Sequence, residues 1–165
     1  MASMTITTPV GPFTILGRDS AVLAAGFTDD ERALLPLVPP HLHTPGDADL
    51  DLAAKAVEAY FDGDLTALDA IAVEQRSGPF LSEAWVALRA IPAGAPVSYT
   101  ELAARAGRPA AVRAAAQACA RNAAALFVPC HRVVRTDGSL GGYRWGIEIK
   151  RYLLTHEAQL TETRS

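Results

Sequence analysis

Cysteine is scarce in this sequence of 165 residues. The two cysteines, Cys119 and Cys130, form no CxxC pair, and no histidines stand at a spacing suited to zinc. This excludes a disulfide-rich scaffold and the common structural zinc sites. Two unpaired thiols fit a reducing compartment, so we expect a cytoplasmic protein.

Long hydrophobic runs are also missing. No apolar run approaches the length that crosses a bilayer, and the first residues lack the basic-then-apolar pattern of a signal peptide. The composition, 50% hydrophobic and 20% charged, is that of an ordinary globular domain. We therefore expect no membrane partner. With 165 residues, the chain is long enough for one full-sized core and a small second lobe.

The charges are divided unevenly along the chain. Residues 1–75 hold three basic and twelve acidic residues, a balance of −9, whereas residues 76–165 hold twelve and six, a balance of +6. Eleven of those twelve basic residues are arginines, which suit phosphate recognition. The asymmetry predicts two lobes, 1–77 and 78–165, with the second facing a polyanion; a merely solvated basic surface would give the same pattern.

The first half of the chain has the pattern of a small α/β lobe with a short antiparallel sheet. Turn-forming proline and glycine separate short β-type segments, and an amphipathic segment that follows has helical spacing. The expected strands are Thr5–Thr8, Phe13–Leu16, Ala21–Phe27 and Leu65–Val73, and the helix runs from Asp49 or Asp51 to about Phe61.

The second half is expected to be mostly helical, which makes the fold class α+β. Ser98 and Glu101 form a capping box that starts a short helix ending at Gly107, and Pro109 is suited to open the next helix, to about Ala120. Two helices joined by a tight glycine-containing turn have the form of a helix-turn-helix. The other expected elements are helices at Phe80–Ile91 and Ile147–Glu157 and a frayed tail at Ala158–Ser165.

Cys130 and His131 stand next to each other after a short apolar run. A cysteine beside a histidine suits nucleophilic catalysis, because the reactive species is the thiolate and a neighbouring base can take the thiol proton. A carboxylate would then hold the imidazole in the right tautomer, and Glu157 is a candidate if the fold brings it there. Alone, the pair is weak evidence, because a buried structural cysteine beside a surface histidine is the commoner case.

A longer string is more specific. Pro129-Cys130-His131-Arg132-Val133, with Asn122 upstream and Gly142-Tyr143-Arg144-Trp145-Gly146 downstream, resembles the signature of the O6-alkylguanine-DNA alkyltransferases. The resemblance covers roughly residues 80–157. It implies direct, single-use transfer of an alkyl group from O6-alkylguanine in double-stranded DNA, possibly also from O4-alkylthymine, to the protein itself. It implies no cofactor, and we expect a monomer in solution.

The resemblance also implies residue roles in the reaction. Cys130 corresponds to the alkyl acceptor, His131 to the base that acts through a water, and Glu157 to the residue that orients His131. Asn122 corresponds to the residue that braces the turn before the cysteine. Tyr99 corresponds to a tyrosine that crowds the phosphate of the flipped nucleotide and helps to protonate the departing base.

Further roles concern DNA and the guanine pocket. Arg113 corresponds to the arginine that enters the base stack where the damaged guanine leaves, and the alanine-rich helix that carries it is expected to approach the minor groove. The other residues expected to contact DNA are Tyr99, Ala114, Arg121 and Arg132. The residues expected to line the pocket are Val133, Tyr143, Arg144 and Trp145.

Two departures from the family pattern make the chain more similar to the C-terminal domain of the bacterial adaptive-response regulator than to the mammalian protein. Ala123 stands where many members have proline, and Trp145 where many have glycine. A tryptophan at the pocket lip is expected to restrict bulky adducts.

Two other function classes are weighed against alkyl transfer. An alkyltransferase-like binding module would replace the acceptor cysteine, usually with tryptophan, and Cys130 argues against it. A plain helix-turn-helix regulator would leave the proline-cysteine-histidine-arginine string and Glu157 unexplained.

Overall fold

The computed structural model describes residues 1–44, 46 and 48–162. The chain falls into two compact units, the first made of Met1–Gln75 and Ala123–Phe127, and the second of the chain on either side of that return, Arg76–Asn122 and from Val128 on. The division after Gln75 lies close to the predicted 77/78 boundary. The return of Ala123–Phe127 to the first unit has no counterpart in the prediction.

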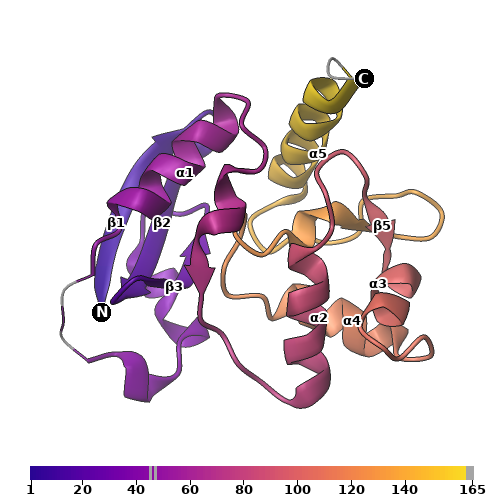
Figure 1. Cartoon of the computed structure of the whole chain (residues 1–165), viewed down its shortest axis with the longest axis horizontal. Coiled ribbons are helices and arrows are strands. Elements are labelled where there is room, and N and C mark those ends of the chain that lie inside the picture. The colour runs from indigo at the N-terminus through magenta and orange to yellow at the C-terminus, as the bar shows by residue number, and fades with distance from the viewer. Residues whose placement is uncertain (45, 47, 163–165) are drawn as a thin grey trace. The chain divides into compact units, whose positions relative to one another are not determined.

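The first unit is built on a four-stranded sheet in the order β1-β2-β3-β4 (Figure 1). Strands β1 (Ala2–Thr8), β2 (Gly11–Arg18) and β3 (Ala21–Gly26) form an antiparallel meander, and β4 (Ala72–Val73) pairs parallel to β3. The first three strands confirm the prediction. Three short 3-10 helices occupy the loop after β3: Glu31–Ala33, Leu35–Leu37 and Pro40–Leu42.

The strand predicted at Leu65–Val73 is wrong over most of its length. Only Ala72–Val73 are in the sheet, and Ala67–Ala70 form a 3-10 helix. The cause is local: a carboxylate oxygen of Asp64 accepts hydrogen bonds from the backbone N–H and the hydroxyl of Thr66, at 3.3 and 3.1 Å. Such side-chain bonds favour a turn over an extended strand.

Aromatic packing holds the returning segment in the first unit. The ring centroids of Phe13 and Phe27 are 4.8 Å apart, and that of Phe127 is 6.3 Å from Phe13. Ala25 of β3 donates to the carbonyl of Ala123 at 2.8 Å and accepts from the N–H of Ala125 at 3.0 Å. The sheet therefore fixes the segment from which the chain returns to the second unit.

The long helix of the first unit is α1 (Asp51–Phe61). It lies close to its predicted range and packs against β1.

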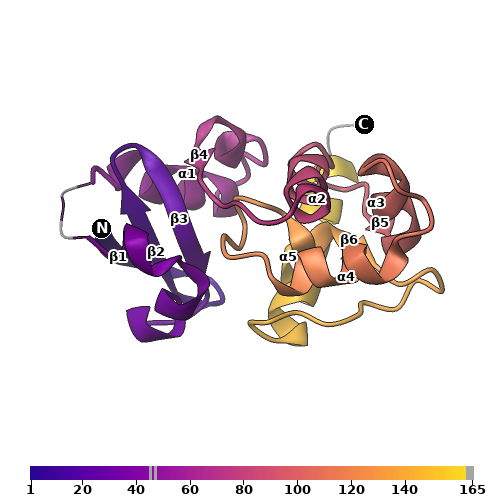
Figure 2. The same cartoon turned by 90° about the horizontal axis from the view of Figure 1, so that it is seen from below.

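The second unit is mostly helical, as predicted (Figure 2). Its helices are α2 (Pro79–Arg89), α3 (Tyr99–Arg105), α4 (Val112–Ala120) and α5 (Ile147–Glu162), with a 3-10 helix at Cys130–Arg132 and two short strands, β5 (Val97–Ser98) and β6 (Val133–Val134). Across the residues that the structure describes, no helix combines the length and the apolar character needed to span a membrane.

The helix pair α3–α4 follows the prediction at its start and departs from it in the turn. The hydroxyl of Ser98 accepts from the N–H of Glu101 at 3.0 Å, which is the predicted cap of α3. Helix α4 begins at Val112 and not at Pro109, because the backbone bond from Ala111 to the carbonyl of Arg108 closes a turn over that proline. That this pair acts as a helix-turn-helix stays a prediction.

Helix α5 continues through residues predicted to fray. The tail was expected to begin at Ala158, but the helix runs to Glu162; residues 163–165 lie outside the described chain. The hydroxyl of Thr161 donates to the carbonyl of Glu157 at 2.9 Å, and its side chain packs directly on Gly94. This contact holds the last turns of α5 against the turn that precedes β5.

Replacing Gly94 with alanine tests that contact. Gly94 has φ +81°, and a Cβ there would lie 2.3 Å from the hydroxyl oxygen of Thr161. We expect Gly94→Ala to lower the free energy of unfolding by about 2 kcal/mol, combining left-handed backbone strain with a steric overlap. Urea denaturation measures this. Gly107→Ala is the matched control, because Gly107 has φ +91° with nothing within 4 Å of the added Cβ.

The control should lose only about 1 kcal/mol, the part due to backbone strain. Adding Thr161→Ala to Gly94→Ala should recover part of the difference. Equal losses in the Gly94 and Gly107 variants would show that the contact with Thr161 does not hold α5.

Candidate active site

The cysteine predicted to be the nucleophile lies in a buried 3-10 turn between the returning segment and β6. Cys130, His131 and Arg132 make up this turn, and all three are buried. Strand β6 pairs parallel with β5, Val97 opposite Val133 and Ser98 opposite Val134. Because β5 leads directly into α3, the pairing brings the start of that helix to the cysteine turn.

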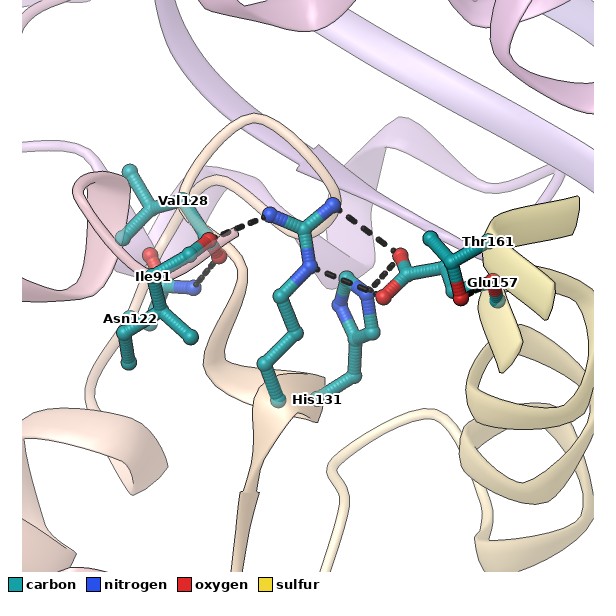
Figure 3. Close-up of polar contacts among 7 residues, drawn as sticks. Ile91, Asn122, Val128, His131, Glu157 and Thr161 are labelled. Carbon is teal, nitrogen blue, oxygen red and sulfur yellow. Dashed lines mark hydrogen bonds and ion pairs between the residues drawn. The ribbon is translucent and has the colours of Figure 1, made fainter. Parts of the chain in front are cut away.

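His131 and Glu157 are in direct contact, as the sequence suggested. Nε2 of His131 lies 2.7 Å from Oε2 of Glu157, and both side chains are fully buried (Figure 3). A hydrogen bond to a carboxylate places the imidazole proton on Nε2, which leaves Nδ1 as the acceptor. Among the residues that the structure describes, none bonds to this buried Nδ1. The ring is thus oriented with its basic nitrogen available.

Arg132 corrects one prediction. It was expected to contact DNA, but its side chain is 6% exposed and points into the unit. Its Nε and Nη2 donate to the two carboxylate oxygens of Glu157 at 2.9 and 3.1 Å, and its Nη1 donates to the carbonyl of Ile91 at 2.7 Å. The guanidinium is fully engaged inside the fold, so it is unavailable to a phosphate.

Asn122 braces the turn, as the resemblance implied. Its amide donates to the carbonyl of Val128 at 2.8 Å in a buried position and also bonds to the thiol of Cys130. Burial raises the pKa of the Cys130 thiol, and the bond from Asn122 and the charges of Lys150 and Arg144 oppose this. The thiol is therefore protonated at rest, and a base must take its proton.

Lys150 is a site residue to which sequence reasoning gave no role. Its ammonium is buried at the start of α5 and donates to the carbonyls of Val133 and Gly142 at 2.7 and 3.2 Å. It also lies 6.0 Å from the ring centre of Tyr99. The lysine thus joins β6 to the glycine-bounded loop and places a positive charge near the thiol. The signal was a lysine at an inward position of an amphipathic helix.

Two of the four residues predicted to line the pocket, Tyr143 and Arg144, interact electrostatically with Cys130; that the four form a pocket stays a prediction. Burial raises the pKa of Tyr143, and so do the nearby Cys130 and Glu157; within the described chain its buried hydroxyl has no hydrogen-bond partner. The pKa of Tyr99 is raised to about 12 by burial and by the two cysteines. Both phenols are therefore proton donors at neutral pH. The guanidinium of Arg144 donates to the carbonyl of Ala120 at the end of α4.

Sequence comparison identifies the second unit. A family profile described as "6-O-methylguanine DNA methyltransferase, DNA binding domain" matches residues 79–159. The "Methylated-DNA--protein-cysteine methyltransferase" of Mycobacterium bovis is 37% identical over 154 residues, 93% of this chain and 90% of that protein. The chain belongs to the O6-methylguanine-DNA methyltransferase family.

Three further relatives and one solved structure are also similar to the chain. The "Regulatory protein ada" of Salmonella typhimurium is 44% identical over 88% of this chain, which spans only 41% of that protein. The chain likewise spans 25% and 59% of the next two relatives, from Escherichia coli and Salmonella typhimurium. The crystal structure of Mycobacterium tuberculosis OGT in complex with DNA matches with a TM-score of 0.78 and 34% identity, covering 96% of this chain and 93% of that one.

In this family member, the residues predicted to contact DNA are divided between surface and interior. Arg113 and Arg121 are exposed on and just after α4, and Ala114 is partly exposed on the same helix. Helix α4 is held from behind, because the indole of Trp85 donates to the carbonyl of Ala118 at 2.9 Å. Arg132 is no longer among the residues expected to contact DNA. That the others, Tyr99, Arg113, Ala114 and Arg121, contact DNA stays a prediction.

Replacing Asn122 with alanine tests whether its side chain braces the cysteine turn. The change leaves the carbonyl of Val128 buried without its donor, which should lower the free energy of unfolding by about 1–3 kcal/mol. It also removes the bond that lowers the Cys130 pKa, so alkylation of this thiol by iodoacetamide at a fixed pH should become slower. Urea denaturation and peptide mapping measure the two effects.

Gln117→Ala is the control, because that side chain is exposed on α4. It should change neither the stability nor the alkylation rate. A thiol that reacts equally fast in the Asn122 variant would mean that the amide supports the loop alone.

Proposed function

We propose that this chain repairs DNA by transferring the alkyl group of O6-alkylguanine to Sγ of Cys130, once per molecule. The observation that carries the proposal is the buried pair His131–Glu157, whose geometry leaves Nδ1 as the basic nitrogen in the residue that directly follows Cys130. The relatives named methylated-DNA--protein-cysteine methyltransferase support the same reaction. The free state of both cysteines supports a cytoplasmic location.

The substrate must first leave the base stack. The O6-alkyl carbon of a paired guanine is enclosed by the duplex, and extruding the nucleotide costs on the order of a few kcal/mol. In the proposed complex α4 lies on the minor groove, where its small alanines permit close approach. Arg113, exposed on that helix, fills the gap left by the guanine and bonds the orphaned partner base.

The thiol is then activated. Its proton passes through a bridging water to Nδ1 of His131, while Nε2–H of the same ring keeps its bond to Glu157. The developing thiolate is stabilised by the amide of Asn122 and by the positive charges of Lys150 and Arg144. These groups act on the charged form of the sulfur only, so they favour the reacting state over the resting thiol.

Alkyl transfer is a single displacement. The thiolate attacks the alkyl carbon, an S–C bond forms, and the bond between that carbon and O6 of guanine breaks. A guanine anion is a poor leaving group, so Tyr99 donates a proton to it as it departs. The proton that His131 took from the thiol then returns to the phenolate of Tyr99. The products are guanine in DNA and a thioether on Cys130. Water has no leaving group to displace there, so the protein is consumed.

Intact-protein mass spectrometry tests the proposal. Incubation with a duplex that contains O6-methylguanine should add one methyl group per chain, located on Cys130 by peptide mapping, with no turnover. Cys130→Ala should remain unmodified, while Cys119→Ala should react like the unaltered protein. Methylation of Cys119, or repair that exceeds one methyl group per chain, would refute the assignment.

Trp145 offers a test of substrate range. The side chain is partly exposed in the loop that contains Tyr143, where we propose that it narrows the pocket mouth. Poor reaction with O6-benzylguanine is therefore expected. Trp145→Gly should raise the benzyl rate relative to the methyl rate by about tenfold, the factor that about 1.4 kcal/mol of relieved steric cost gives. Comparable second-order rates for both adducts in the unaltered protein would contradict this.

A further inference from the structure

Arg132 is buried, and each of the three nitrogens of its guanidinium donates a hydrogen bond. Two nitrogens bond the carboxylate of Glu157, at 2.9 and 3.1 Å, and the third donates to the carbonyl of Ile91 at 2.7 Å (Figure 3). Ile91 directly follows the cap of α2, where the helix dipole favours a cation. An arginine fixed in this way is a permanent charge in the interior, since the guanidinium does not lose its proton at accessible pH.

This arginine adds to the effect of burial, which by itself already favours the neutral form of His131. With Arg132 present, Glu157 is already neutralised, so the buried cluster has no net charge when His131 is neutral. A proton on His131 would leave one uncompensated positive charge in the interior, which is costly. Without Arg132 the balance reverses, because the carboxylate would then be compensated only by an imidazolium.

Resting on the proposed function, we propose that Arg132 is a positioning residue that keeps His131 neutral, and therefore able to accept the thiol proton, by compensating the charge of Glu157. A carboxylate alone raises the pKa of a neighbouring histidine, so the ring would act as a base only at higher pH. Compensation of Glu157 by Arg132 therefore favours an oriented, neutral imidazole.

The other charged groups around His131 fit this role. Lys150, on α5, adds a second positive charge, while Cys130 and Tyr143 are neutral at rest because burial raises the pKa of each. Burial lowers the pKa of His131, Glu157 raises it, and Arg132 and Lys150 lower it. Glu157 is thus the one group among these that favours a protonated ring, and it is the group that Arg132 bonds.

The test is the pH dependence of methyl transfer in single-turnover experiments. In the unaltered protein the lowered pKa of His131 keeps the ring neutral, so the rate should persist below the ordinary histidine value of 6.5. In Arg132→Met the ring should retain its proton to higher pH. The loss of rate relative to the unaltered protein should then be several-fold greater at about pH 6 than at about pH 8.5, because a rise of one pKa unit lowers the neutral fraction of the ring by at most about tenfold.

Arg132→Lys, which keeps the charge but not the fork, should have its acid limb nearer to that of the unaltered protein. Arg32→Met is the matched control: Arg32 bonds both carboxylate oxygens of Asp30 in the same forked way, at 3.0 and 3.2 Å, but on the surface. It should leave the pH profile unchanged.

A second measurement, the titration of the His131 ring by NMR, needs no reaction and can be made on the lysine variant if the methionine variant does not fold. The His131 pKa should rise from the unaltered protein to the lysine variant and further in the methionine variant. A parallel loss of rate at every pH with an unchanged His131 titration would overturn the inference and leave Arg132 a structural residue. Failure of the unaltered protein to methylate Cys130 at any pH would refute the proposed function instead.

Discussion

The hydrogen bonds of the Glu157 carboxylate are the interactions on which the second unit depends. The carboxylate lies in the interior of α5 and bonds two consecutive residues of the cysteine turn, His131 and Arg132. An unpaired carboxylate in this position would be strongly destabilising, so the helix and the turn must dock together. One side chain therefore fixes the last helix, orients the imidazole and compensates the arginine. The packing of Thr161 on Gly94 extends the same docking by one helical turn.

The position of the segment that precedes Cys130 is fixed by other interactions, most of them made by the backbone. Asn122 ends one passage through the second unit, the next five residues are held by the sheet of the first unit, and Val128 begins the return. The amide of Asn122 bonds the carbonyl of Val128, so the two ends of this excursion are joined. Leu126, at φ +68°, is one of the two non-glycine residues of the described chain in the left-handed region. Its strain is tolerated because the residues on both sides are fixed.

Local patterns predicted the elements, and distant contacts decided the exceptions. The cap at Ser98, the range of α2 and the first three strands depend on neighbours in sequence, and each was predicted from them. The role of Arg132 was not predicted. An arginine in a basic half of the chain is expected to contact phosphate, whereas the structure shows it buried against Glu157 of α5. Lys150 is a similar case, since its carbonyl partners come from β6 and from the loop that precedes α5. The pairing of His131 with Glu157 was suggested by chemical type and a family resemblance, because no spacing in sequence could establish it.

A buried, protonated thiol would be a poor nucleophile for an enzyme that must turn over, but it suits the single-use reaction that we propose. Burial raises the pKa of Cys130, so little thiolate exists at rest and the sulfur is protected from oxidants and from other electrophiles. The groups that can stabilise a thiolate, Asn122 and Lys150, are already in place and become effective when the proton leaves. In the proposed reaction the proton leaves only when the imidazole of His131 accepts it. Reactivity would then be governed less by the sulfur than by the protonation state of His131, and that state would depend on how the charge of Glu157 is compensated.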